Sequence, residues 1–220
     1  MISNFKQIEK LWKELDTYTN KTINFYVIGG AVLVHQELKP ATKDIDLIIS
    51  TKESYESLCN ILKTRGFEQK NPTGVYESMF ISGIFERRDV RLDLFLETVC
   101  KKLHLSSEMM KRAQQSFSGK YLQVYHCANE DIFLFKSMTD REGDLEDNIT
   151  LAKTGLNWKY IMTEIKDQIN QYGTDVWITW IGERFDLLEE KGIQIPIMNE
   201  IDQLRNSYFD KIEKDYHNEI

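Results

Sequence analysis

The pattern of apolar residues changes near Asn129, and this change is the strongest constraint on the fold of the 220-residue chain. Before it, short runs rich in β-branched residues alternate with helix-like segments and glycine turns. After it, apolar residues recur every three or four positions, which is typical of amphipathic helices. The sequence therefore predicts an α+β fold, with a mixed sheet and flanking helices over residues 1–127 and a helical bundle over residues 128–220 packed on it.

Individual elements follow from the same periodicity and from turn residues. In the first half we expect helices over residues 5–15, 31–38, 50–65 and 107–112, and strands over residues 24–28, 43–49, 75–81, 90–96 and 121–125. A capping box at residues 50–53 begins one of these helices, and Ser82 with Gly83 forms the turn before the strand that starts at Val90. In the second half we expect helices over residues 129–139, 144–153, 158–172, 176–190 and 197–216.

Composition restricts the class of protein. The formal net charge of −7 and pI near 5.2 argue against a uniformly basic nucleic-acid binder, although Arg87, Arg88 and Arg91 leave a local contact open. The three cysteines are Cys59, Cys100 and Cys127. They are dispersed and lack CxxC spacing, so we expect buried thiols in a reducing, cytoplasmic environment. No run is long enough to span a bilayer, and no membrane partner is expected.

Three aspartates carry the chemistry that the sequence predicts. On a strand, alternate side chains share a face, so Asp44 and Asp46 project together while Ile45 and Leu47 point to the apolar side. A second strand carries Asp93. Three neighbouring carboxylates repel one another unless a cation compensates them, and oxygen ligands of this kind suit Mg²⁺. The sequence therefore predicts a metal site made of Asp44, Asp46 and Asp93.

A glycine pair precedes these aspartates. Gly29 and Gly30 follow an expected strand and open an expected helix. A helix that begins at such a turn points free N–H groups and partial positive charge outward, which suits a triphosphate. Glycine pairs are also common in plain turns, and acidic residues at strand edges are often merely solvated.

The ordered combination resembles the DNA polymerase β-like nucleotidyltransferase superfamily. Its pattern is a Gly-Gly or Gly-Ser turn, an Asp-x-Asp strand and a third Asp on a later strand, here Gly29-Gly30, the segment from Thr42 to Asp46, and Asp93. The resemblance implies a nucleotidyltransferase-type sheet, two bound Mg²⁺ ions with Mn²⁺ as an alternative, and nucleotide contacts at Gly29, Gly30 and Thr42. It also implies that Asp44 and Asp46 bind both ions, while Asp93 helps to activate the attacking hydroxyl.

A later segment is similar to the AbiEii-like branch, whose members are toxins of toxin–antitoxin pairs. It contains Lys136, Arg141, Asp144 and Asp147. The resemblance implies that Lys136 contacts the nucleotide and that Arg141, Asp144 and Asp147 support the site. The spacings also fit ordinary helix ion pairs between Lys136 and Asp140, or between Arg141 and Asp144.

These features predict an enzyme that transfers a nucleoside monophosphate from an NTP to an acceptor hydroxyl and releases pyrophosphate. The AbiEii-like resemblance implies an RNA acceptor such as tRNA and an antitoxin partner. The acidic net charge fits a small acceptor equally well, and the glycine and Asp-x-Asp arrangement is also similar to aminoglycoside- and lincosamide-modifying nucleotidyltransferases. Two further alternatives are a non-catalytic nucleotide-binding protein that kept the fold and a purely structural α+β domain.

Overall fold

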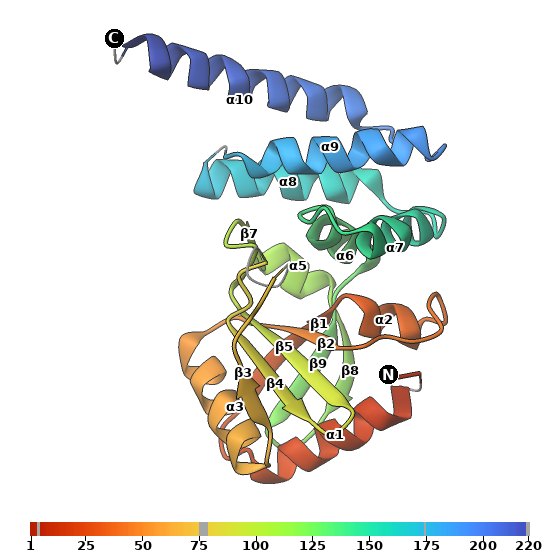
Figure 1. The fold of residues 1–220 in the computed structure, drawn as a ribbon, viewed down its shortest axis with the longest axis vertical. Helices are drawn as coiled ribbons and strands as arrows, with labels where there is room; N and C mark the ends of the chain where they lie inside the picture. Colours follow the sequence, from red (N-terminus) through yellow and green to blue (C-terminus); the bar gives the residue numbers. More distant parts are fainter. Residues whose placement is uncertain (4, 75–78, 174, 219–220) are drawn as a thin grey trace. The chain divides into compact units, whose positions relative to one another are not determined.

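The computed structural model describes residues 1–3, 5–74, 79–173 and 175–218, with side chains up to Asp215. The chain divides into two compact units, Met1–Ala128 and Asn129–Ile220. The sequence places this boundary one residue earlier, between residues 127 and 128. The predicted α+β class is confirmed, because the first unit contains a mixed sheet with helices and the second contains helices (Figure 1).

The first unit is built around a seven-stranded sheet in the order β3-β4-β5-β2-β1-β9-β8. The strands are β1 (Ile23–Ile28), β2 (Ile45–Ile49), β3 (Glu68–Lys70), β4 (Gly83–Arg87), β5 (Val90–Leu96), β8 (Gln114–Ser118) and β9 (Leu122–His126), with β6 (Thr98–Val99) and β7 (Leu103–His104) in a separate pair. The helices of this unit are α1 (Phe5–Tyr18), α2 (Gly30–His35), α3 (Lys52–Thr64) and α5 (Ser107–Arg112). The pairs β1–β9 and β2–β5 are parallel and the others are antiparallel, so the sheet is mixed.

One face of this sheet forms the main core of the unit with α1 and α3. On α1, the apolar residues at helical spacing are buried as predicted, and the Trp12 ring packs edge-on against Phe25 of β1 at 5.0 Å between centroids. Phe25 pairs in register with Ile49 of β2, which shares that face with Leu47 and Ile45. The alternate residues of β2 therefore point to the other face, and Asp46 is among them.

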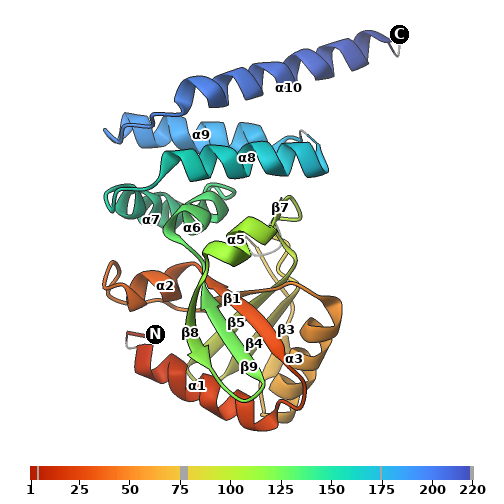
Figure 2. The ribbon, with the colours of Figure 1, turned by 180° about the vertical axis from the view of Figure 1, so that it is seen from behind.

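The second unit is a helical bundle of α6 (Asn129–Lys136), α7 (Glu142–Ala152), α8 (Trp158–Tyr172), α9 (Trp177–Glu190) and α10 (Met198–Asn218). In Figure 2, α10 runs along α9, and α7 lies beside α6. The rings of Phe133, Trp158 and Phe185 pack together in its core. Among the described residues, no helix combines the length and apolarity needed to cross a bilayer.

One strand prediction is wrong over the residues that the structure describes, and one turn prediction is wrong. Residues 79–81 of the strand predicted over 75–81 form turn and irregular structure, and residues 75–78 lie outside the described part of the chain. Gly83 is not in a hairpin turn, because it begins β4. The turn before β5 instead contains Arg88 with a φ of 54°. Positive φ is usually found at glycine or asparagine, so the sequence does not indicate a turn at this arginine. Strands β3 and β8 were not predicted, since neither carries a buried residue.

Several helix ends also differ from the prediction. Thr51, not Ser50, caps α3, and its side chain accepts a hydrogen bond from the Ser54 N–H. Helix α2 ends at His35, three residues before the predicted end, and Glu37 then adopts a φ of 60°. Helix α6 ends at Lys136 instead of Thr139. These differences leave the order of the elements around the candidate site unchanged.

Candidate functional site

Strands β2 and β5 bring two of the predicted aspartates together. The strands are parallel neighbours, and Asp46 pairs in register with Asp93. Residues that are opposite each other on adjacent strands project from the same face of a sheet. Asp93 is buried, with a side chain only 1% exposed, whereas Asp46 is partly exposed. The first unit therefore places a buried and a more accessible carboxylate side by side.

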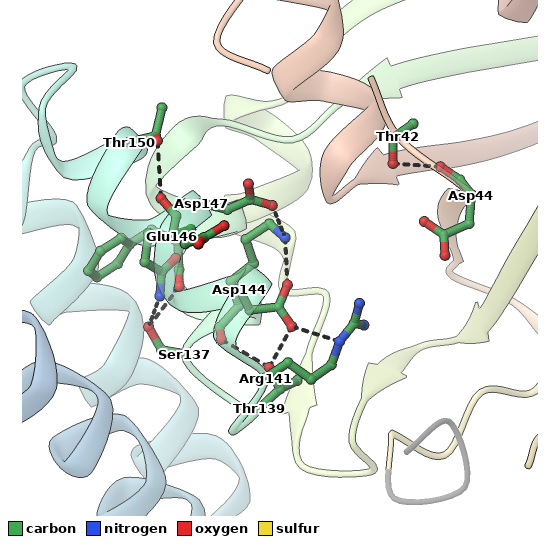
Figure 3. Close-up of polar contacts among 12 residues, drawn as sticks. Thr42, Asp44, Ser137, Thr139, Arg141, Asp144, Glu146, Asp147 and Thr150 are labelled. Atoms are coloured by element: carbon green, nitrogen blue, oxygen red, sulfur yellow. Dashed lines mark hydrogen bonds and ion pairs between the residues drawn. The ribbon is translucent and has the colours of Figure 1, made fainter. Parts of the chain in front are cut away.

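The glycine pair lies against Asp46 and Thr42. An ideal Cβ built on Gly29 would come within 2.3 Å of Asp46 Oδ2, and one built on Gly30 would come within 2.5 Å of Thr42 Oγ1. The Thr42 hydroxyl in turn donates to the Asp44 backbone carbonyl at 3.2 Å (Figure 3). Asp44 lies outside β2, which starts at Ile45, so the prediction that strand geometry points its side chain to the same face as Asp46 is not met. The glycines allow the backbone to approach the acidic segment closely.

The Asp93 carboxylate is held by Arg91, two residues earlier on the same face of β5. Arg91 Nε donates to Asp93 Oδ1 at 2.7 Å, and a terminal guanidinium nitrogen donates to Oδ2 at 2.9 Å. The side chain of Arg91 is 22% exposed. Two parallel charge-assisted hydrogen bonds are the strongest arrangement available to a carboxylate and an arginine.

The donor chemistry of the first unit fits a divalent cation. Carboxylate oxygens are the ligands that Mg²⁺ prefers, and Asp46 and Asp93 offer them from one face of the sheet. Among the residues that the structure describes, no three Asp, Glu, His or Cys side chains lie close enough to form a ready-made ligand set. Mg²⁺ usually keeps several waters and takes further oxygens from substrate phosphates, so two or three protein carboxylates suffice.

The second unit buries the remaining candidate residues in one charged network. Lys136 Nζ lies 2.7 Å from Asp144 Oδ1 and 2.8 Å from Asp147 Oδ2. The Thr139 hydroxyl donates to Asp144 Oδ2 at 2.6 Å, and Arg141 Nε lies 3.6 Å from the same oxygen (Figure 3). Lys136, Asp144 and Asp147 are buried. The predicted helix pair between Arg141 and Asp144 is thus present, while Lys136 pairs with Asp144 and Asp147.

Charge compensation sets the pKa values in this network. Burial alone would raise the pKa of Asp144, but the neighbouring Lys136 and Arg141 hold it below its ordinary value. Burial alone would lower the pKa of Lys136, but the two carboxylates hold it above its ordinary value. Lys136 and Asp144 therefore both stay charged near neutral pH.

The arginines near Asp93 have different partners, which their closeness in the sequence does not indicate. Arg87 makes two hydrogen bonds to Glu14 of α1, at 2.6 and 2.8 Å, whereas Arg91 binds Asp93. The signal available in the sequence was the two-residue spacing of Arg91 and Asp93, which places both side chains on one face of a strand.

Comparison with known proteins decides the family. A family model described as "Nucleotidyltransferase of unknown function (DUF6036)" matches residues 3–176. The chain belongs to this nucleotidyltransferase family. The predicted nucleotidyltransferase class is confirmed at this level. The match takes in the candidate residues of both units of this DUF6036 nucleotidyltransferase and ends before α9.

Other comparisons add little. No curated protein matches this nucleotidyltransferase. Two solved structures are similar to it, ANT(2″)-Ia in complex with adenylyl-2″-tobramycin and the solution structure of the antibiotic-resistance factor ANT(2″)-Ia. Both are 12% identical with a TM-score of 0.49, and the matches cover 76% of this chain and 97% and 91% of the respective neighbours.

Proposed function

We propose that this protein transfers a nucleoside monophosphate from an NTP to an acceptor hydroxyl, with Asp44, Asp46 and Asp93 as ligands of two Mg²⁺ ions or of Mn²⁺. The observation that carries the proposal is the in-register pairing of Asp46 with Asp93 on adjacent parallel strands. The close approach of Gly29 to the Asp46 carboxylate supports it.

In the proposed reaction the acceptor oxygen bonds to the α-phosphorus, and the bond from that phosphorus to the bridging oxygen of pyrophosphate breaks. The chemistry that bound divalent ions would supply is a lower pKa for the acceptor hydroxyl and neutralisation of charge on the leaving pyrophosphate. Asp44 and Asp46 would hold these ions through their carboxylate oxygens, since a carboxylate cannot itself bind an anionic phosphate. Asp93, deeper in the sheet, takes the hydroxyl proton or passes it to solvent. The protein therefore contributes position and charge, as phosphoryl-type transfers require.

We propose that the nucleotide contacts the backbone at Gly29 and Gly30, the Thr42 hydroxyl and Lys136. The proximity of Thr42 to Gly30 supports the first group. Lys136 is held by Asp144 and Asp147, so a phosphate would compete with these carboxylates for its ammonium group. Arg141, Asp144 and Asp147 would then support the site by fixing the position of Lys136.

For the acceptor we propose RNA, with the protein acting as the toxin partner of an antitoxin, because of the AbiEii-like resemblance of the segment from Lys136 to Asp147. A small-molecule acceptor is the second candidate. It is favoured by the net charge of −7 and by the ion pair between Arg87 and Glu14, which removes one arginine from an RNA-binding surface. The burial of all three cysteine side chains supports a reducing, cytoplasmic location.

The test is selective labelling. Each α-labelled NTP is incubated with the protein and Mg²⁺, and then with total RNA, a protein extract or an antibiotic panel. Label on RNA supports the toxin proposal, and label on a small molecule alone refutes it. Asp46→Asn and Asp93→Asn should abolish transfer, whereas Asp89→Asn, an exposed carboxylate in the β4–β5 turn, should not. Mg²⁺-dependent NTP binding without transfer to any acceptor would favour a non-catalytic nucleotide-binding protein.

A further inference from the structure

Arg91 stands between two carboxylates of different exposure. On one side it makes its two hydrogen bonds to Asp93, at 2.7 and 2.9 Å. On the other side its second terminal nitrogen lies 4.0 Å from Glu86 Oε1. Glu86 is the in-register partner of Arg91 on the antiparallel neighbour β4, so both side chains share one face of the sheet. The side chain of Glu86 is 41% exposed and that of Asp93 is 1% exposed.

The hydrogen-bonded pair of Arg91 and Asp93 compensates a buried negative charge. A carboxylate as buried as Asp93 is costly without a compensating charge, and Asp46 beside it adds like-charge repulsion. Arg91 supplies the missing positive charge through both oxygens. Those oxygens are also the ones that a cation must bind if Asp93 is a metal ligand. The guanidinium and the cation therefore compete for the same acceptor.

Glu86 offers the displaced guanidinium a second acceptor. A shift of about 1 Å would shorten the 4.0 Å separation to an ordinary charge-assisted hydrogen bond. The partly exposed Glu86 is already hydrated, so receiving the arginine does not require burial of a new charge. The arginine can thus leave Asp93 without losing all its carboxylate contacts.

We propose that Arg91 is a positioning residue that holds Asp93 while no cation is bound and transfers to Glu86 when a divalent cation takes the Asp93 oxygens. This inference rests on the proposed function, because it needs Asp93 to be a metal ligand. Reciprocity of coupled equilibria requires that an arginine which resists metal binding is itself displaced by metal. The exchange keeps the buried carboxylate compensated at every stage.

The experiment measures Mn²⁺ binding to the full-length, NTP-free protein, by the free-Mn²⁺ electron paramagnetic resonance signal and by calorimetry. Arg91→Gln removes the competitor and should tighten Mn²⁺ binding about tenfold, within the usual range of coupled equilibria. Arg91→Lys keeps the positive charge but cannot make the two parallel hydrogen bonds to Asp93, and it should tighten Mn²⁺ binding less than Arg91→Gln does. It also serves if Arg91→Gln does not fold. Arg88→Gln, an exposed arginine of the same hairpin, is the matched control and should leave affinity unchanged.

Glu86→Gln distinguishes exchange from simple long-range charge. In the wild-type background it should weaken Mn²⁺ binding several-fold, because the displaced arginine loses its second partner. In the Arg91→Gln background it should have no effect, since the guanidinium is absent. Equal weakening in both backgrounds, or unchanged or weaker binding in both Arg91 variants, would overturn the inference.

Asp93→Asn separates this inference from the proposed function. It should abolish the binding that Arg91→Gln tightens. Mn²⁺ binding that survives Asp93→Asn, or no Mn²⁺ binding by any variant, would overturn both the metal assignment and the exchange. Metal-dependent transfer that is lost in Asp93→Asn but accompanied by unchanged Mn²⁺ affinity in both Arg91 variants would leave the proposed function standing and refute the exchange alone.

Discussion

Gly29 occupies the space directly against the carboxylate of Asp46: a β-carbon on Gly29 would stand 2.3 Å from Asp46 Oδ2. Gly29 also has a φ of 70°, a conformation that L-residues rarely adopt. The glycine therefore serves two purposes, turning the chain from β1 into α2 and leaving room for a partly exposed carboxylate.

Gly29→Ala should displace Asp46 and lower nucleotidyl transfer about 100-fold, the cost of a misplacement of about 1 Å in a reacting site. The backbone strain should also reduce the free energy of unfolding by about 1–3 kcal/mol, because φ of 70° with ψ of −151° is a conformation that essentially only glycine adopts. Transfer rates and urea unfolding measure the two effects. Gly66→Ala is the matched control, because Gly66 has a φ of 78° with no atom within 4 Å of the added carbon. Gly66→Ala should lose stability through backbone strain but keep the wild-type rate of transfer. A loss of transfer as large as that of Gly29→Ala would contradict the explanation.

Lys136→Met should destabilise the protein by about 3–5 kcal/mol, because Asp144 and Asp147 would be left buried without their cation. Urea unfolding at pH 7 measures this. Lys159→Met, on an exposed position of α8, should change the free energy of unfolding by less than about 0.5 kcal/mol. An unchanged stability of Lys136→Met, together with weaker NTP binding, would mean that Lys136 serves the nucleotide only.

The segments that the sequence predicted best carry both an apolar pattern and an end signal. Helix α8 begins and ends at the predicted residues, because the Asn157 side chain accepts hydrogen bonds from the N–H groups of Lys159 and Tyr160 and Gly173 ends the helix with a φ of 85°. Strand β5 likewise has the predicted bounds, and its alternating residues include Asp93. Local chemistry was sufficient in these segments.

Long-range contacts explain what the sequence left open. The edge strands β3 and β8 contain no buried residue, and they are held in the sheet by pairing with β4 and β9, which no local sequence pattern indicates. The register that aligns Asp46 with Asp93 depends on segments 47 residues apart in the chain (93 minus 46). The partners of Arg87 and Arg91 also depend on the fold. These two arginines are close in the sequence, but Arg87 pairs with Glu14 and Arg91 pairs with Asp93.

Acidification should destabilise the protein through His126. Burial and the neighbouring His35 lower the pKa of His126 to about 4, and its Nε2 is buried without a hydrogen-bond partner. The unfolded chain binds a proton near pH 6.5, so this contribution to stability is full above that pH and is lost as pH falls toward 4. We expect a loss of about 2 kcal/mol between pH 7 and pH 5 from this group.

Urea unfolding at the two pH values tests this loss, and His126→Phe should remove most of the difference. His104, whose pKa is also lowered by burial, is only partly buried and is the comparison variant. If His104→Phe removes the change in free energy of unfolding between the two pH values and His126→Phe does not, the change comes from His104 and the prediction is wrong. Titration of the His126 ring by nuclear magnetic resonance checks the pKa directly.

Asp16→Asn should loosen the junction between α1 and the β8–β9 hairpin. The Asp16 carboxylate accepts hydrogen bonds from the backbone N–H groups of Lys120, Tyr121 and Leu122 at 2.8–2.9 Å. Although burial alone would raise the pKa of Asp16, these donors hold it below its ordinary value. In asparagine only the side-chain oxygen accepts hydrogen bonds, because the NH₂ group is a donor. We therefore expect Asp16→Asn to lose about 1–3 kcal/mol in the free energy of unfolding.

The contribution of Asp16 has a definite pH window, since a carboxylate with a lowered pKa stabilises the fold above its unfolded pKa and loses that effect as pH falls through the folded value. The difference in free energy of unfolding between wild type and Asp16→Asn should therefore become smaller below pH 4. Asp89→Asn should differ little from wild type. Gly119→Ala provides an independent check, because its added carbon would stand 2.4 Å from the Asp16 carboxyl group. If Gly119→Ala is destabilising in wild type but equally so in the Asp16→Ala background, the close packing of Asp16 against Gly119 is not the cause.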